Sequence, residues 1–213
     1  MGREESTQAR IAWPRFLQGE DAGEIAARLT HGDPLKLGAS AARRLRERRL
    51  LLDPDRVLHR ALAVAARGAL IDTPVLDLDA WALQKLDAAI DQLVCADREA
   101  QLSQPEILED EEKEFALLTE SLMIEPELVR ACSVAFNALP ELPRRAFFEL
   151  MIEGREVEEV VEAGPWDEDG LYEAIHAALG ALGLDALGES AEDRGDELLE
   201  DCLLYTSDAA DEL

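Results

Sequence analysis

Neighbouring carboxylates are the side chains in this sequence whose types and spacing come nearest to reaction chemistry. Glu158 lies beside Glu159, and Asp167 lies two positions before Asp169. Such a pair can act as acid and base only when an apolar pocket raises the pKa of one carboxyl beside its partner. The chain contains 47 Asp and Glu residues, so close carboxylate pairs arise without any catalytic reason. We therefore predict that the protein is not an enzyme.

Histidines are the next candidates, because they could hold a metal ion. His31, His59 and His176 are far apart in the sequence and lack the close spacing of a zinc motif. A glycine-rich phosphate loop is also missing from the sequence. We therefore expect neither a metal nor a cofactor.

The three cysteines, Cys95, Cys132 and Cys202, show neither metal-binding nor disulfide spacing. Unpaired thiols are typical of a reducing compartment, and the N-terminus carries no basic-then-apolar export signal. No apolar run reaches the roughly 18 residues that a membrane span needs. These features favour a cytoplasmic protein with no membrane partner. Cys95 and Cys132 are expected to be buried on apolar helix faces.

Charge divides the chain into two halves of opposite sign. The formal net charge is -26, and most of such a surface repels phosphates, which excludes a generic non-specific nucleic-acid binder. Residues 1–67 hold 13 Lys and Arg against 9 Asp and Glu, whereas residues 68–213 hold 8 against 38. The basic excess comes mainly from one stretch, with Arg43, Arg44, Arg46, Arg48 and Arg49. This stretch is either a solvated helix face or a patch for an acidic partner, which could be nucleic acid or the chain's own acidic half.

The pattern of apolar residues predicts an all-helical chain. Ala and Leu dominate, β-branched residues are few, and strand-like alternation is nearly absent. Asp33-Pro34, Asp53-Pro54 and Glu125-Pro126 mark helix starts, because proline suits the first helical turn. Apolar residues then recur at helical spacing. The expected helices are 21–30, 34–50, 54–70, 79–97, 105–123, 126–138, 142–153, 156–163 and 168–183.

One acidic stretch divides these helices into two small lobes, and a second acidic stretch follows the second lobe. We expect an N-terminal helical lobe over 1–97, an acidic linker and helix over 98–124, and a second lobe over 125–183. Residues 184–201 are rich in Gly, Asp and Glu, and such a composition predicts disorder.

The second lobe carries the most specific pattern in the chain. Leu139-Pro140 opens a helix that Glu153-Gly154 ends, and a short acidic helix follows. Gly164-Pro165 breaks that helix, and Asp167 caps a third, amphipathic one. This order of helices and turns is typical of a helix-turn-helix. One small core is expected beneath the three helices, formed by Phe147, Phe148, Val160, Leu171, Ile175 and Leu179.

Residues 138–183 resemble region 4 of the bacterial sigma-70 family of RNA polymerase sigma factors, especially the small extracytoplasmic-function type. The resemblance rests on Leu139-Pro140, Arg144-Arg145, Glu153-Gly154 and the short helix around Glu158-Glu159. It implies a helix-turn-helix lobe in a transcription initiation or regulatory protein that binds core RNA polymerase and promoter DNA. The residues that it implies for weak DNA binding are Arg144, Arg145, Arg155, Gly170, Tyr172, Glu173 and His176.

The third helix of this lobe departs from the family in its charge. Basic, DNA-facing positions of the family hold Tyr172, Ala174 and Ala177 here, and Glu173 replaces a small hydroxyl residue. Arg, Lys, Asn and Gln are the residues that read base edges and hold phosphates, so we predict weak promoter binding. The alternative is a non-enzymatic protein-interaction module. It would keep the helix-turn-helix as a scaffold and bind an anti-sigma factor or another basic protein through its acidic face.

A weaker resemblance lies upstream, over 54–97. Leu78-Asp-Ala-Trp81 followed by Ile90-Asp91 is similar to the end of sigma region 2, which in the family melts promoter DNA with basic and aromatic residues. Here the family's basic stretch is replaced by Val94-Cys-Ala-Asp97. Trp81 is accordingly interpreted as a residue of the core.

Residues 202–212 resemble one translated frame of a sequencing adapter along their whole length. The resemblance implies that the natural sequence is followed only as far as Asp201. We expect residues 202–213 to pack on nothing, because they were not selected with this fold.

Overall fold

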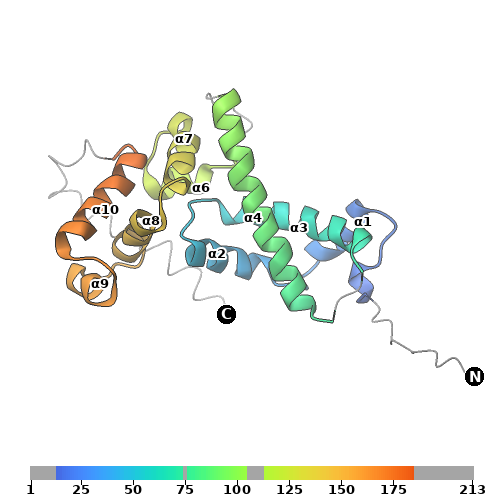
Figure 1. The fold of residues 1–213 in the computed structure, drawn as a ribbon. Coiled ribbons are helices and arrows are strands. Elements are labelled where there is room, and N and C mark those ends of the chain that lie inside the picture. Colours follow the sequence, from blue (N-terminus) through green and yellow to red (C-terminus); the bar gives the residue numbers. More distant parts are fainter. Residues whose placement is uncertain (1–12, 74–75, 105–112, 185–213) are drawn as a thin grey trace, which may run out of the picture. The chain divides into compact units, whose positions relative to one another are not determined.

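The computed structural model describes residues 13–73, 76–104 and 113–184. Every regular element in these three ranges is a helix, and they contain no strand (Figure 1). The all-helical fold is therefore confirmed. Within the same ranges, no helix is long and apolar enough to cross a bilayer. Residues 185–201 of the stretch predicted to be disordered, 184–201, lie outside the described residues, and so does the adapter-like tail.

Most helices lie where the sequence pattern predicts them. In chain order the elements are the 3-10 turn η1 (Arg15–Leu17), α1 (Ala22–Thr30), α2 (Leu37–Arg48), α3 (Pro54–Ile71), α4 (Leu78–Ser103), α6 (Ala116–Leu122), α7 (Pro126–Asn137), α8 (Glu141–Phe147), the π-helical η2 (Phe148–Ile152), α9 (Val157–Ala163) and α10 (Glu168–Ala181). Pro54 and Pro126 begin α3 and α7 as expected. α2 begins later than Pro34, because the Asp33 carboxylate accepts hydrogen bonds from the N–H groups of Leu37 and Gly38, both at 2.9 Å.

The chain divides into two compact units. Among the described residues, the first unit takes 13–42 and 54–93, and the second takes 43–53 and 94–184. The expected N-terminal lobe of 1–97 differs from this division, because residues 43–53 belong with the C-terminal helices. α4 also remains helical to Ser103, so the first residues of the predicted acidic linker are part of a helix.

The core of the first unit includes a tryptophan fixed by a charged pair. Trp81 is 4% exposed, which confirms its interpretation as a core residue. Its Nε1 donates to Asp72 at 2.9 Å, and Lys85 forms an ion pair with the same carboxylate at 2.6 Å. The Lys85 ammonium also lies 5.4 Å from the Trp81 ring centroid, and the Trp13 ring packs at 5.2 Å. Gly68 leaves room for this arrangement, because a Cβ there would meet Lys85 Cε at 2.7 Å.

This network predicts an acid-sensitive contribution to stability. Hydrogen bonds from Lys85 and then Trp81 hold the pKa of Asp72 below its ordinary value. A carboxyl with a lowered folded pKa stabilises the fold above the unfolded value of about 3.9 and loses that effect as pH falls through the folded value. The Asp72→Asn variant should therefore be less stable than the unaltered chain at pH 7, and this difference should shrink below about pH 4.

Urea unfolding at a series of pH values, followed by tryptophan fluorescence, measures this difference. Asp79→Asn is the matched control, since Asp79 is exposed in the first turn of α4 and its change should have little effect. A difference for Asp72→Asn that stays constant down to pH 2 would contradict the lowered pKa.

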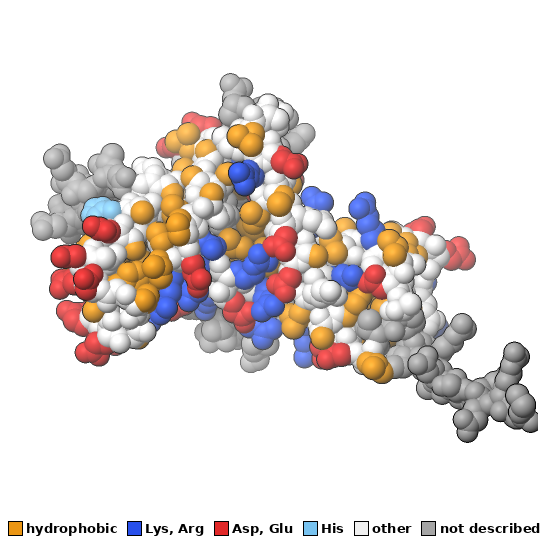
Figure 2. All heavy atoms as spheres, in the orientation of Figure 1, with side chains coloured by type: hydrophobic (Ala, Val, Ile, Leu, Met, Phe, Trp, Pro, Cys, Tyr) orange, Lys and Arg blue, Asp and Glu red, His pale blue; other side chains and the backbone are white. Residues whose placement is uncertain are grey.

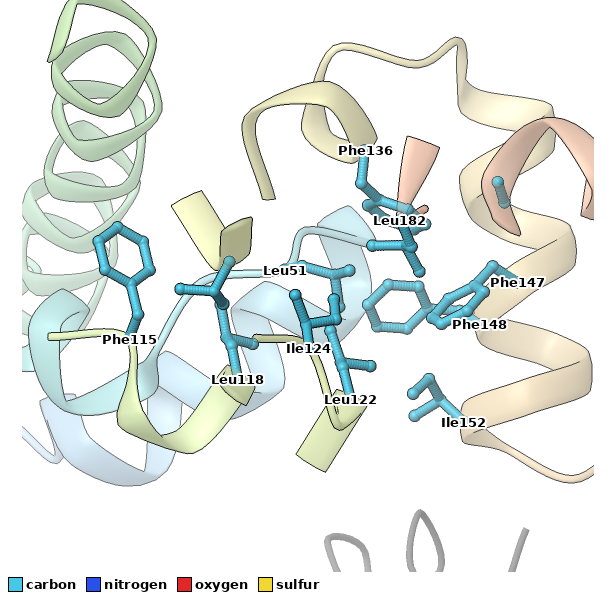
Figure 3. Close-up of a cluster of buried hydrophobic side chains, with 12 residues drawn as sticks. Leu51, Phe115, Leu118, Leu122, Ile124, Phe136, Phe147, Phe148, Ile152 and Leu182 are labelled. Carbon is cyan, nitrogen blue, oxygen red and sulfur yellow. The ribbon is translucent and has the colours of Figure 1, made fainter. Parts of the chain in front are cut away.

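The core of the second unit gathers aromatic residues from α7, α8 and η2 (Figure 3). The Phe136 ring centroid lies 5.1 Å from that of Phe147 and 6.3 Å from that of Phe148. Leu51 reaches the same cluster from the segment between α2 and α3. Leu182 enters it from the end of α10. The C-terminal helices therefore bury their apolar faces around a residue from the N-terminal part of the sequence.

The single core expected beneath the last three helices is in fact two clusters. Phe147 and Phe148 belong to the cluster just described, and Ile175 and Leu179 pack against it. Val160 and Leu171 instead join Ala146 and Ala174 in a second, smaller cluster. The two clusters lie on different sides of α8, because neighbouring residues of a helix point in different directions: Ala146 enters the smaller cluster and Phe147 the larger one.

Two cysteines, Cys95 and Cys132, lie in the described segments, and neither is fully buried as the sequence predicts. Cys95 is exposed on α4. Cys132 is partly buried, and its Sγ donates to the Leu182 carbonyl at 3.4 Å. Burial raises the pKa of the Cys132 thiol. The prediction of two buried cysteines is therefore wrong for Cys95.

Candidate functional site: the lobe of α8 to α10

The helix starts and stops in this lobe have local causes. α9 ends at Ala163, directly before Gly164-Pro165. A Cβ at position 164 would lie 2.3 Å from the Trp166 ring, so glycine is needed where the chain turns. Asp167 then caps α10, and its Oδ1 accepts from the Gly170 N–H at 2.9 Å. The main-chain N–H of Gly170, one of the predicted site residues, is therefore engaged by the side chain that caps α10.

A buried carboxylate lies at the centre of the lobe's charged contacts. Glu149, in η2, is 5% exposed. Arg145 Nε donates to its Oε1 at 2.5 Å, and Arg155 NH1 donates to its Oε2 at 2.8 Å. Arg49 approaches the same carboxylate at 4.0 Å. Buried carboxylates are stable when they are paired and hydrogen-bonded in this way, so Arg145 and Arg155 serve the fold.

Arg145 has a further contact within the lobe. Its guanidinium lies 5.0 Å from the ring centroid of Trp166, in the turn before α10. Arg155 also donates to the Glu159 carbonyl at 3.2 Å. These contacts tie η2, α9 and the following turn together, and they fix both arginine side chains.

Arg144 is directed to the main chain that follows α2. Its NH1 donates to the carbonyls of Arg48 and Arg49, at 3.0 and 3.1 Å. Burial is the main reason that the pKa of the Arg144 guanidinium is lowered. The negative charge of Glu141 raises this pKa, whereas the positive charges of Arg48 and Arg49 lower it. Its Nε is buried and lacks a hydrogen-bond partner in the described part of the chain. Arginine remains charged even so, and this one is held inside the second unit.

The exposed side of α10 carries the remaining predicted site residues. Tyr172, Glu173 and His176 are exposed, and so is Ala177. Ala174 is only 8% exposed and belongs to the smaller cluster. The expectation that position 174 faces a ligand, as in the family, is therefore wrong for this chain, because that side of α10 packs on α8 and α9.

Carboxylates surround that exposed side of α10. Figure 2 shows acidic side chains gathered over α9 and α10, with a histidine beside them. The exposed acidic residues between positions 156 and 173 are Glu156, Glu158, Glu159, Glu162, Asp167, Glu168, Asp169 and Glu173. We refer to them as the acidic face. Arg155 forms an ion pair with Glu159 of this set at 3.9 Å, and both Arg145 and Arg155 pair with the buried Glu149.

No protein-family model, curated protein or solved structure matches this chain. The described ranges contain no group of three or more His, Cys, Asp or Glu side chains that could hold a metal ion. The carboxylates of the acidic face form a negatively charged surface on α9, α10 and the turn between them.

Glu149 is the important residue that the sequence reasoning missed. A signal for it was present, because Glu149 is a single carboxylate within the apolar run Phe147–Ile152 and lies four positions after Arg145. Charges at that spacing meet on a helix. The resemblance assigns Arg144, Arg145 and Arg155 to weak DNA binding, whereas in the structure Arg145 and Arg155 pair with Glu149 and Arg144 donates to a main-chain carbonyl.

Proposed function

We propose that the protein is a non-enzymatic, sigma-70-like transcription protein of the cytoplasm, which binds core RNA polymerase and uses the lobe of α8 to α10 for protein contacts. The order of α8, α9 and α10 and the turn at Gly164-Pro165 support this proposal, because they agree with the helix-turn-helix order predicted for residues 138–183. Promoter DNA is at most a weak ligand of this lobe.

One observation carries the choice of a protein partner. Every arginine that the resemblance assigns to DNA is bound within the second unit: Arg144 to carbonyls, and Arg145 and Arg155 to Glu149. DNA binding gains most of its affinity when Lys and Arg replace the counterions of phosphates. The acidic face offers the opposite charge, and such a surface attracts a basic protein surface and speeds the encounter.

Binding of the full chain to purified core RNA polymerase tests the proposal. We expect a complex that weakens as salt rises and that the Asp169→Asn, Glu173→Gln double variant weakens further, because both carboxylates are exposed on α10. The control removes the same charge elsewhere, at Glu20 and Asp79, which are exposed in the first unit. Equal affinities of the two double variants, or no complex at all, would refute the proposal.

A second candidate is an interaction module that acts without polymerase. The acidic face favours it, since eight exposed carboxylates within 156–173 would suit an anti-sigma factor or another basic protein. A salt-dependent complex with a basic protein, together with no binding to core polymerase, would favour this candidate over the first.

A further inference from the structure

The segment that joins α2 to α3 is bound by α7 through its main chain. We refer to residues 48–52 as the strap. Asn137 Oδ1 accepts from the Leu51 N–H at 2.9 Å, and Asn137 Nδ2 donates to the Leu51 carbonyl at 3.0 Å. Ser133 Oγ donates to the same carbonyl at 2.7 Å. One asparagine and one serine thus satisfy both main-chain polar groups of a single residue, Leu51.

Arg144 also binds main-chain atoms of the strap. Its two hydrogen bonds go to the carbonyls of Arg48 and Arg49, the residues at the end of α2. We refer to Ser133, Asn137 and Arg144 as the strap site. They bind main-chain atoms that any amino acid other than proline would offer. All three lie on helices, α7 and α8, which hold them in fixed positions.

The strap holds three buried leucines, of which Leu51 enters the aromatic cluster of the second unit; Leu50 and Leu52 are 7% and 2% exposed. Leu51 is 6% exposed and enters the cluster that contains Phe115, Phe136 and Phe147 (Figure 3). Recognition of main-chain polar groups together with an apolar pocket for one side chain is how proteins capture non-helical peptide segments. The strap site has the chemistry of a peptide-binding site.

We propose that the strap site binds non-helical, leucine-bearing segments and that the strap fills it in cis, as an autoinhibitory contact. A tethered segment acts at an effective concentration on the order of millimolar. A free peptide therefore enters only when the strap leaves. This proposal does not depend on the function proposed above, because its site lies on α7 and α8 and its ligand is a peptide.

The test releases the strap in the full chain and offers a free copy of it. The probe is a fluorescein-labelled peptide of residues 46–54, Arg-Glu-Arg-Arg-Leu-Leu-Leu-Asp-Pro. The Leu51→Asp variant should expel the strap, because the apolar cluster cannot accept a carboxylate. We expect this variant to bind the peptide at least about tenfold more tightly than the unaltered chain, by fluorescence anisotropy.

Matched variants distinguish binding at the strap site from non-specific attraction between a basic peptide and an acidic chain. Adding Asn137→Leu to Leu51→Asp should abolish the gain, whereas adding Gln92→Leu, an amide change at an exposed position of α4, should preserve it. A peptide with aspartate in place of Leu51 should not bind. The proposal is overturned if that peptide binds equally well, or if Asn137→Leu leaves the gain intact.

Circular dichroism shows whether the Leu51→Asp variant keeps its helices. If it does not, Leu51→Ala takes its place, because alanine weakens the apolar anchor without placing a charge in the cluster. A folded variant of either kind that binds the peptide no better than the unaltered chain would also overturn the proposal.

Discussion

The Phe136→Ala variant is expected to lower the free energy of unfolding of the second unit by about 3–5 kcal/mol. The side chain is 0% exposed, and its ring packs against those of both Phe147 and Phe148. Its removal leaves a cavity that helices fixed on several sides cannot fill. Domains are stable by only about 5–15 kcal/mol, so this loss is a large part of the total. Urea unfolding followed by tryptophan fluorescence measures it, with Trp166 reporting on this unit and Trp13 and Trp81 on the first.

Phe16→Ala is the control for this variant. Phe16 is only partly buried and belongs to the first unit, so the same chemical change should have a smaller effect. A loss below about 1 kcal/mol for Phe136→Ala would show that the aromatic cluster is not packed as described.

Three cations placed on the exposed side of α10 are expected to turn a poor DNA binder into a measurable one. The unaltered full chain should bind duplex DNA more weakly than about 10 μM at physiological salt, since its C-terminal cations are engaged internally. Tyr172→Lys, His176→Arg and Ala177→Arg together should raise the affinity about tenfold or more. They should also steepen the dependence of log K on log salt by about 3, because each new phosphate contact releases a counterion.

The choice of these positions follows from burial. Tyr172, His176 and Ala177 are exposed, whereas an arginine at Ala174 would have to enter the smaller cluster. The neutral triple variant Tyr172→Gln, His176→Gln, Ala177→Gln controls for the loss of the native side chains and should not gain affinity. Nanomolar binding by the unaltered chain in a mobility-shift assay would contradict the internal engagement of the arginines.

Helix positions were readable from the sequence because their causes are local. Pro54, Pro126 and Asp167 each act on the first turn of their own helix, and Gly164 acts on the turn where it lies. Such effects reach only a few residues along the chain. The π-helical turn was not predicted, because its hydrogen-bond pattern is decided by how its side chains pack.

The roles of the charged residues needed the tertiary structure. In the sequence, Arg144 and Arg145 stand at positions where a DNA-binding lobe could use them. In the fold, Arg144 donates to Arg48, which is 96 positions away. A partner so far away in the sequence depends on how whole helices pack, and short-range sequence patterns do not predict it.

The sequence by itself determined that the chain is helical, where most helices begin and end, and that its C-terminal half is strongly acidic, because composition and short-range spacing decide these properties. Only the tertiary structure decided that the strap belongs with the C-terminal helices, that Glu149 draws Arg145 and Arg155 inward, and that Ala174 is buried while Tyr172 is exposed. These outcomes depend on which surfaces are removed from water when distant segments meet. Burial of that kind is a property of the packed whole, so it becomes visible only when the helices are placed together.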